Sequence, residues 1–380
     1  MKKFILPFIL ITVMMLASCR TEPVNTTTRT EGLNFLYYRY NDTYPDECVL
    51  DVYRKDDTVK RAVIMIYGSA WLGIRGVVDR DSIVNDKDLF LNNGYHVVNM
   101  DHRRIKIKDI QPTYIDMIND VKDAIQYIKD NADLFKIDTS NIILYGYSSG
   151  AHVAELYSYS VSDSPIPVRL CIAKAGVSDF TNHKFRECDP FGFTSDEKLR
   201  TDVIRLIKAF SCSKEIRDKF IEAGSKEEQA KILDSIPDSE VADPFRVALV
   251  KTLLGIESDE TDDINVIADS TDDEIQRKIK DVSPLYHVKN KTIQTGDLYT
   301  PPYTILLHGQ QDKLVDYSMS VDLHEELGGF SQLFLMPNAG HDLLHNDPSD
   351  DTVYKEFEKR IVNMLDTIRE EPIHLTETHY

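Results

Sequence analysis

The most informative segment of this sequence is Asn141-Ile-Ile-Leu-Tyr-Gly-Tyr-Ser-Ser-Gly-Ala-His152. It begins as a short apolar run typical of a buried strand and continues into a helical pattern. Between the two, Gly146-Tyr-Ser-Ser-Gly150 matches Gly-x-Ser-x-Gly, in which a sharp strand-to-helix turn presents the serine hydroxyl above a sheet. The helix N-terminus favours negative charge that develops there. The segment predicts that Ser148 is a nucleophile, the alternative being a Gly/Ser turn that only caps a helix.

A serine nucleophile needs a general base, and two later segments supply a base and an acid. His341 lies in Pro337-Asn-Ala-Gly-His-Asp342, just after the last predicted strand. Asp312 lies in His308-Gly-Gln-Gln-Asp312, just after the strand before it. Loops that follow neighbouring parallel strands converge at one end of a sheet, so we expect Ser148, Asp312 and His341 to meet. His341 would take the serine proton, and Asp312 would hold the imidazole tautomer and stabilise its protonated form.

Other residues compete for these roles. His152 is four residues from Ser148, one turn along the same helix, and is interpreted as a packing histidine. His308 is interpreted as stabilising its own turn. The remaining rivals are His345 for the base, and Asp316 and Asp342 for the acid. Asp312 is preferred because of its distance from the end of the strand.

A third strand end offers candidates for stabilising an oxyanion. Tyr67-Gly-Ser-Ala-Trp-Leu-Gly73 follows the apolar run Ala62–Ile66. A backbone donor to an oxyanion is worth on the order of 10²–10³ in rate. Trp71, the single tryptophan, is either a wall of the substrate pocket or part of the core. Trp71 and Tyr147 are the candidate substrate-binding residues, and the candidate donors are the backbone N–H groups of Ser69, Ala70 and Ser149.

Strand and helix patterns alternate along the chain, which predicts an α/β fold. Continuous apolar strands indicate a sheet that is buried on both faces and therefore mainly parallel. The first two strands flank a turn-like segment and predict an antiparallel hairpin. About eight strands result, at residues 34–40, 48–53, 62–67, 95–100, 141–145, 168–173, 303–307 and 332–336. Apolar residues at helical spacing follow Pro112 and recur from Val353 to Ile368.

One interval breaks this alternation. More than 100 residues separate the strand that ends near Ala175 from the one that starts near Tyr303, and a connection of that length must contain structure of its own. We predict an inserted helical cap at about residues 179–280, with the acidic segment 257–263 as a mobile loop. The cap is either a lid over the site or a scaffolding insertion.

The N-terminus has the pattern of a targeting segment. Two lysines precede an apolar run too short to span a bilayer, which predicts a signal peptide over residues 1–18. Leu16-Ala-Ser-Cys19 resembles the bacterial lipobox, which implies an exported lipoprotein anchored to a membrane through acyl chains on Cys19 and facing the periplasm or the cell surface. The alternative is an ordinary cleaved signal. Residues 19–31 are polar and predict a flexible tether, which leaves residues 32–380 for the folded domain.

Composition narrows the class of protein. The chain has 380 residues, 42% of them hydrophobic and 28% charged, which are ordinary globular values. Its net charge of −19 argues against binding nucleic acid. The sequence has no P-loop, His-Glu-x-x-His or Cys-x-x-Cys pattern, and neither a cofactor nor a metal is expected. Of the cysteines other than Cys19, Cys171 is interpreted as a buried thiol, and the pairing among Cys48, Cys171, Cys188 and Cys212 stays open.

The sequence resembles the α/β-hydrolase superfamily, in particular bacterial esterases of the hormone-sensitive-lipase-like and feruloyl- or acetylxylan-esterase-like branches. The resemblance extends over about residues 38–366 without the cap, and its carriers are Leu50–Tyr53, Tyr67–Gly73, Asn99–Arg103, Gly146–His152, His308–Asp312 and Asn338–Asp342. The segment after residue 66 is similar to the HGGGW-type oxyanion loop of that superfamily. It departs from that pattern, because Tyr67 replaces the histidine and Ser69 and Ala70 replace two glycines.

These observations favour a serine hydrolase that acts on carboxylic esters. The resemblance implies a small-molecule or glycan ester as the substrate, and it leaves the oligomeric state open. Two alternatives remain at this stage: a peptidase of the prolyl-oligopeptidase type, and a non-catalytic ligand-binding protein with the same fold.

Overall fold

The computed structural model describes most of the chain between residues 27 and 370. The described ranges are 27–30, 33–44, 47–68, 70–72, 86–105, 111–187, 214–256, 264–294 and 300–370, with separate residues between 189 and 208. The predicted signal peptide, the lipidation residue Cys19, the acidic segment 257–263 and the cysteines Cys188 and Cys212 lie outside these ranges.

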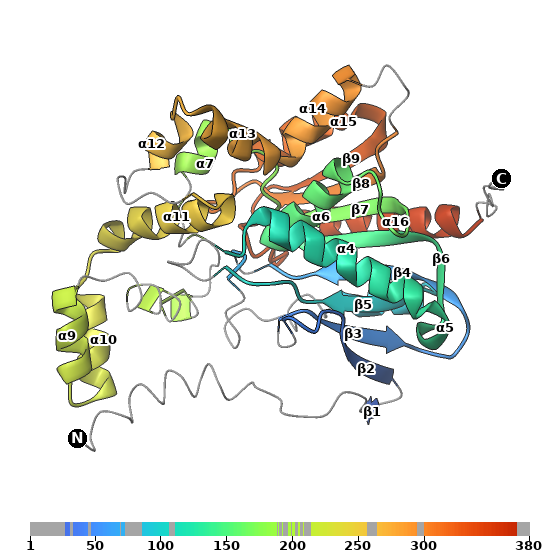
Figure 1. The fold of residues 1–380 in the computed structure, drawn as a ribbon, viewed down its shortest axis with the longest axis horizontal. Helices are drawn as coiled ribbons and strands as arrows, with labels where there is room; N and C mark the ends of the chain where they lie inside the picture. The colour runs from blue at the N-terminus through green and yellow to red at the C-terminus, as the bar shows by residue number, and fades with distance from the viewer. Residues whose placement is uncertain are drawn as a thin grey trace.

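The described residues form a nine-stranded sheet in the order β1-β2-β3-β5-β4-β6-β7-β8-β9 (Figure 1). The pairs β1–β2, β2–β3 and β3–β5 are antiparallel. The remaining pairs, β5–β4, β4–β6, β6–β7, β7–β8 and β8–β9, are parallel. The strands are β1 Thr27–Thr30, β2 Leu33–Arg39, β3 Val49–Arg54, β4 Lys60–Ile66, β5 His96–Met100, β6 Ile137–Tyr147, β7 Val168–Lys174, β8 Tyr303–Gly309 and β9 Ser331–Met336.

The predicted α/β fold with a mainly parallel sheet is confirmed, but the tether prediction is wrong at its end. Residues 27–30 form strand β1, which pairs with residues 33–36 of β2. Threonine is β-branched and suits an edge strand. A segment without apolar residues gives no periodicity from which that strand could be predicted. Strand β6 begins at Ile137, earlier than the predicted start at residue 141. Residues 138–141 are polar, so no apolar pattern indicated this part of the strand.

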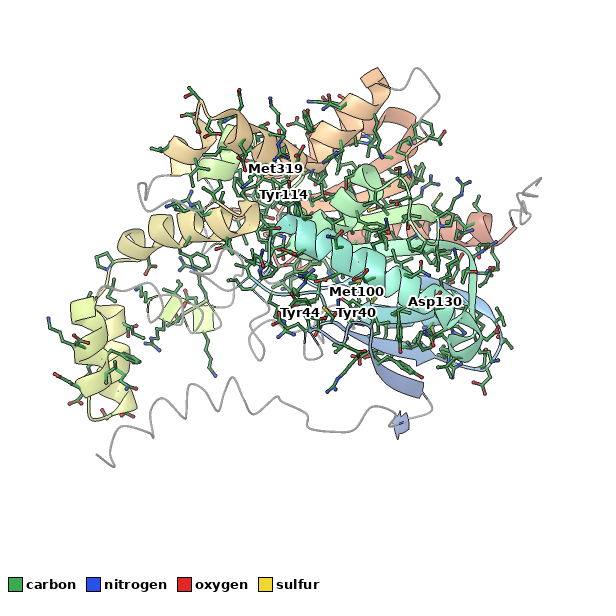
Figure 2. All side chains as sticks on the ribbon, viewed as in Figure 1. Tyr40, Tyr44, Met100, Tyr114, Asp130 and Met319 are labelled. Carbon is green, nitrogen blue, oxygen red and sulfur yellow. The ribbon has the colours of Figure 1, made fainter. Side chains whose placement is uncertain are left out.

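Helices cover both faces of the sheet. Alternate residues of β4 enter different cores: Ile64 lies with helix α4 (Tyr114–Asp130), and Met65 lies with helix α16 (Pro348–Glu370). Figure 1 shows α4 in front of the sheet and α16 behind it. Tyr40 and Met100 belong to the same core cluster as α4 (Figure 2). The other helices of the main body are α3 Lys87–Asn92, α5 Ala132–Phe135, α6 Ser149–Ser160, α15 Ser318–Leu327 and the 3₁₀ turn η1 Gly328–Phe330.

Between β7 and β8 the described residues include several helices and add no strand to the sheet. We call the part at about residues 179–283 the insert, and we call residues 178–180 and 283–285, which join its two ends, the stem. At the stem, Leu285 donates its N–H to the Ser178 carbonyl and Phe180 donates its N–H to Ser283 Oγ, both at 2.9 Å. The described helices here are α7 His183–Glu187, α9 Lys214–Glu222, α10 Lys226–Asp234, α11 Asp238–Leu254, α12 Ile264–Ala268, α13 Asp273–Asp281 and α14 Pro284–Gln294.

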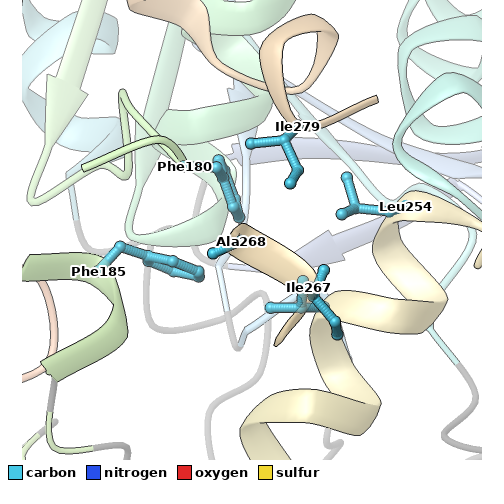
Figure 3. A pocket seen from close by; sticks show the side chains of 7 residues that line it. Phe180, Phe185, Leu254, Ile267, Ala268 and Ile279 are labelled. Atoms are coloured by element: carbon cyan, nitrogen blue, oxygen red, sulfur yellow. The ribbon is translucent and has the colours of Figure 1, made fainter. Parts of the chain in front are cut away.

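The insert encloses a small apolar pocket (Figure 3). Helices α7, α11, α12 and α13 all contribute to it, together with the chain that leaves β7. Its lining residues are Phe180, Phe185, Val250, Leu254, Ile267, Ala268 and Ile279. Most of these residues belong to the same core cluster as Ile64 and helix α4, so the apolar core of the main body continues into the insert.

Of the four cysteines other than Cys19, two lie in the described ranges. Cys48 and Cys171 are buried free thiols, as predicted for Cys171. Burial raises the pKa of Cys48 to about 12, which makes its thiol unreactive at neutral pH. Across the described ranges, none of the helices combines the length and the apolar character needed to cross a bilayer.

Candidate active site

Ser148 occupies a strained turn between β6 and α6. Its φ of 56° is in the left-handed region, which non-glycine residues rarely adopt. Its N–H donates to the Lys174 carbonyl at 2.8 Å. The two glycines of the motif allow close approach: a Cβ at Gly146 would lie 2.3 Å from the Gly150 oxygen, and one at Gly150 would lie 2.2 Å from the Ile66 oxygen. The sharp turn therefore needs both glycines.

The structure brings Ser148, His341 and Asp312 together. His341 Nε2 lies 2.9 Å from Ser148 Oγ, and His341 Nδ1 lies 2.7 Å from Asp312 Oδ2. These residues follow strands β6, β9 and β8, whose carboxyl ends meet at one edge of the sheet. Since an ionised carboxylate only accepts, Nδ1–H donates to Asp312 and Nε2 is free to accept the serine proton.

Asp312 is held in its ionised form. Burial by itself would raise the pKa of this carboxyl, but the electrostatic interaction with His341 and hydrogen bonds from His308 and His341 hold the pKa well below its usual range. Asp312 Oδ1 also accepts the N–H groups of Leu314 and Val315, each at 2.9 Å. Hydrogen bonds to both carboxylate oxygens therefore fix the orientation of Asp312.

His308 contributes more than the sequence suggested. Its Nε2 donates to Asp312 Oδ2 at 3.1 Å and to the Val315 carbonyl at 2.9 Å, while its Nδ1 accepts from Ser320 Oγ at 2.7 Å. It stabilises its turn, as predicted, and it also supports the carboxylate that contacts His341. The one sign of this contact in the sequence was that His308 and Asp312 are four residues apart in the same turn.

Tyr147 also contacts His341. Its hydroxyl donates to the His341 carbonyl at 2.7 Å, and the two ring centroids are 5.4 Å apart. Burial raises the pKa of Tyr147, so it stays neutral. The contact positions the His341 backbone, and the predicted role of Tyr147 in substrate binding stays a prediction.

The loop after β4 lies beside the Ser148 turn. A Cβ at Gly68 would be 2.6 Å from the Tyr147 carbonyl oxygen. Ser69 lies outside the described residues. Trp71 donates its N–H to Ser149 Oγ at 3.0 Å, so this N–H is already used. Ala70 and the N–H of Ser149, which is in the first turn of α6 and has no partner within the helix, remain the described candidates for oxyanion donors.

Trp71 and His152 lie together beneath the insert. The Trp71 side chain is 4% exposed and belongs to the main core cluster. Its role as a pocket wall stays a prediction. His152 is fully buried and makes no contact with Ser148 Oγ, which agrees with its interpretation as a packing histidine.

A buried ion pair near the site was not predicted. Lys174, the last residue of β7, lies 2.8 Å from Asp86 Oδ2. Asp86 also accepts from the Tyr145 hydroxyl. Burial would lower the pKa of Lys174, but Asp86 and Tyr354 raise it, so the lysine is charged. The partners are far apart in sequence, and no local pattern indicated the pair. Among the described residues, no group of His, Cys, Asp or Glu side chains is arranged to hold a metal ion.

Comparison with known proteins agrees with this fold. Residues 50–201 match the BD-FAE family model. The structure is similar to that of esterase B from Lactobacillus rhamnosis, with a TM-score of 0.54 and 16% identity over 96% of each chain. The chain has the α/β-hydrolase fold. The predicted resemblance to that superfamily is thereby confirmed.

Two further solved structures are similar to this one. A truncated carbohydrate esterase from gut microbiota gives a TM-score of 0.53 at 17% identity, covering 91% of this chain and 100% of that one. A butyrate-bound esterase, Est2, from Thermogutta terrifontis gives 0.51 at 16% identity, covering 89% and 95%. A search of curated proteins gives no significant match.

Proposed function

We propose that this α/β-hydrolase is a serine esterase in which Ser148, His341 and Asp312 are catalytic. The observation that carries the proposal is the continuous set of contacts from Asp312 through His341 to Ser148, at 2.7 and 2.9 Å. The serine hydroxyl is within reach of a neutral imidazole nitrogen, and the imidazole is oriented by an ionised carboxylate.

The reaction proceeds in two acyl-transfer steps. Ser148 Oγ attacks the ester carbonyl carbon while His341 Nε2 takes the hydroxyl proton. The tetrahedral intermediate collapses, and His341 returns that proton to the departing alcohol. Water then attacks the acyl-serine with His341 again as the base, and the carboxylic acid leaves. Asp312 stabilises the imidazolium in both steps, and backbone N–H groups of Ala70 and Ser149, with Ser69, receive the oxyanion.

The substrate is proposed to be a small carboxylic ester or an acyl ester of a carbohydrate. Esterases and a carbohydrate esterase are among the similar structures, one of them with butyrate bound. No observation favours the peptidase. The alternative of a non-catalytic binding protein does not account for the contacts that join Ser148, His341 and Asp312.

The surrounding segments have proposed roles as well. We assign residues 1–18 to a signal peptide, Cys19 to lipidation and residues 19–26 to a tether, so that the hydrolase domain is anchored at a membrane outside the cytoplasm. The insert, at about residues 179–280, is proposed to be a cap over the site. Its attachment beside β7, at the carboxyl edge of the sheet, supports that assignment.

The test is hydrolysis of p-nitrophenyl acetate and butyrate by protein lacking residues 1–19, compared with its Ser148→Ala variant. We expect Ser148→Ala to lower kcat by about 10⁴-fold or more. A fluorophosphonate should label Ser148 in the unchanged protein and leave the variant unlabelled. Ser160→Ala, at the far end of α6, is the matched control and should keep full activity. Folded protein that hydrolyses neither ester and takes no label would refute the proposal.

A further inference from the structure

The loop that follows β4 has a backbone conformation that its residues do not favour. Ala70 and Trp71 have φ values of 50° and 60°. Glycine adopts such values freely, whereas an L-residue with a bulky side chain does so only when surrounding contacts hold it there. The sequence places alanine and tryptophan at these positions. Contacts to Trp71 therefore help to hold this conformation.

Trp71 is held at three points. Its N–H donates to Ser149 Oγ at 3.0 Å, and its carbonyl accepts from the N–H of Ile105 at 2.9 Å. Its indole Nε1–H donates to His152 Nδ1 at 3.1 Å. Two of these three contacts come from the first turn of α6, the helix that begins directly after Ser148.

His152 has one possible orientation and one tautomer. An indole N–H can only donate, so Nδ1 accepts and the ring proton resides on Nε2. Nε2–H donates to the Val282 carbonyl at 2.8 Å. The rings of Trp71 and Phe180 pack edge-on against the imidazole, at centroid distances of 5.3 and 5.2 Å. Burial lowers the pKa of His152 to about 4, which keeps the ring neutral and both hydrogen bonds intact.

Val282 connects this arrangement to the insert. It is the residue that ends α13, and the adjacent Ser283 side chain accepts the N–H of Phe180 across the stem. The stem therefore fixes the Val282 carbonyl, the carbonyl fixes His152, and His152 fixes the indole of Trp71. All of these groups are buried.

We propose that His152 is a positioning residue of the esterase: it clamps Trp71 against the insert stem and so holds the backbone N–H groups of the oxyanion loop in place beside Ser148. The inference rests on the proposed function. In this chain the clamp supplies the conformation that glycines would otherwise allow at the same positions.

The main test replaces His152 by leucine, which fills a similar volume without either hydrogen bond. We expect kcat for p-nitrophenyl acetate to fall about 10- to 100-fold with KM changed less than about threefold, because the loop donors act mainly on the transition state. His152→Gln, which can accept from the indole and donate to the carbonyl, should recover most of the loss. Trp71→Phe keeps an aromatic ring but removes the indole N–H. We expect a similar loss of kcat, and we expect that the losses of Trp71→Phe and His152→Leu do not add in the double variant.

His287 offers a matched control. It donates its Nε2–H to the Asp281 carbonyl at 2.7 Å, next to Val282, and its ring packs against Tyr286 rather than Trp71. We expect His287→Leu to leave kcat unchanged within about twofold. Because Trp71 is the single tryptophan of the chain, its fluorescence emission reports the clamp directly. The emission should shift in His152→Leu and stay unchanged in His287→Leu.

The outcomes separate this inference from the proposed function. A kcat within twofold of the unchanged protein, with or without an emission shift, would overturn the positioning role, as would a loss confined to KM or additive losses in the double variant. If His152→Leu fails to fold, Trp71→Phe decides by the same criteria, and His152→Gln, which should keep most of the activity, shows that the position tolerates replacement. Absence of any Ser148-dependent hydrolysis in the unchanged protein overturns the proposed function instead.

Discussion

Glu155 is a buried carboxyl group on α6, about two turns beyond Ser148. Its side chain is 1% exposed, and within the described part of the chain its Oε2 has no hydrogen-bond partner. Burial raises the pKa of Glu155 to about 8, so the group is protonated in the folded protein at neutral pH. In the unfolded chain the same group is ionised above about pH 4.5. Folding therefore takes up a proton.

This proton uptake predicts how stability changes with pH. Between about pH 4.5 and 8 the folded state binds more protons at Glu155 than the unfolded state does, so the free energy of unfolding falls as pH rises, by about 1.4 kcal/mol per pH unit at most. Glu155→Gln removes that dependence. We expect the variant to be more stable than the unchanged protein at pH 8, by a few kcal/mol, and similar at pH 4.5.

Urea unfolding at a series of pH values measures this difference. The exposed Glu227→Gln provides the control and should follow the unchanged protein at every pH. Parallel curves for Glu155→Gln and the unchanged protein would contradict the prediction.

Single residues differ in how far the sequence alone could predict them. The places of Ser148, Asp312 and His341 were predictable because each lies within a few residues of the end of a strand, and the carboxyl ends of parallel strands meet at one edge of the sheet. The contacts of His152 were not. Its partners Trp71 and Val282 are 81 and 130 residues away, and a histidine within a helix carries no local sign of either.

At the level of elements, the first turn of α6 is packed against the end of β4. A Cβ at Gly150 would lie 2.2 Å from the Ile66 oxygen and 2.5 Å from the Tyr67 oxygen, and both obstacles are backbone atoms. Neither can rotate away as a side chain can. The distance between the helix and the strand is thus set by the absence of a side chain at one position.

This packing predicts a large effect from adding one methyl group. Gly150→Ala should force α6 away from β4, which we expect to destabilise the fold by about 3 kcal/mol or more and to lower esterase activity in whatever protein remains folded. Thermal and denaturant unfolding measure the first effect, and p-nitrophenyl acetate hydrolysis measures the second. A Cβ at Gly329 would meet nothing within 4 Å, so Gly329→Ala is the control. Equal stability of the two variants would show that the close approach does not exist.

Helices and strands were predictable where their apolar residues follow a regular pattern, either a continuous run or a helical spacing. The central strands are apolar throughout, and α16 shows Phe357, Ile361 and Leu365 at helical spacing, all buried as expected. Strand β1 was missed because an edge strand can be polar on both faces. Strand β1 forms through backbone hydrogen bonds to β2, and such bonds do not depend on whether the side chains are apolar.

For the whole molecule, the sequence predicted the sheet and the existence of a helical segment between β7 and β8, but not how the insert packs. Its apolar pocket combines residues from α7, α11, α12 and α13. Helix periodicity gives each apolar face and leaves the choice of partner open. The connection from the stem to Trp71 depends on that choice.

The proposed anchoring also belongs to this scale. If Cys19 carries acyl chains, the full-length protein expressed in a bacterium should sediment with membranes, and Cys19→Ser should move it to the soluble fraction with its esterase activity intact. Incorporation of radiolabelled palmitate checks the modification itself. Cys188→Ser, which leaves Cys19 in place, serves as the control. Membrane association that persists in Cys19→Ser would rule out anchoring through this residue.

The stem ties the two ends of the insert together beside β7, at Ser178–Leu285 and at Phe180–Ser283. Roughly a hundred residues therefore leave the sheet and return to it at a single point. A segment attached in this way can be shortened, lengthened or exchanged without re-threading any strand, since the entropy of closing a loop grows only slowly with its length. During descent from a common ancestor, this region of the chain is free to diverge in length and shape while the strands that carry the catalytic groups keep their order.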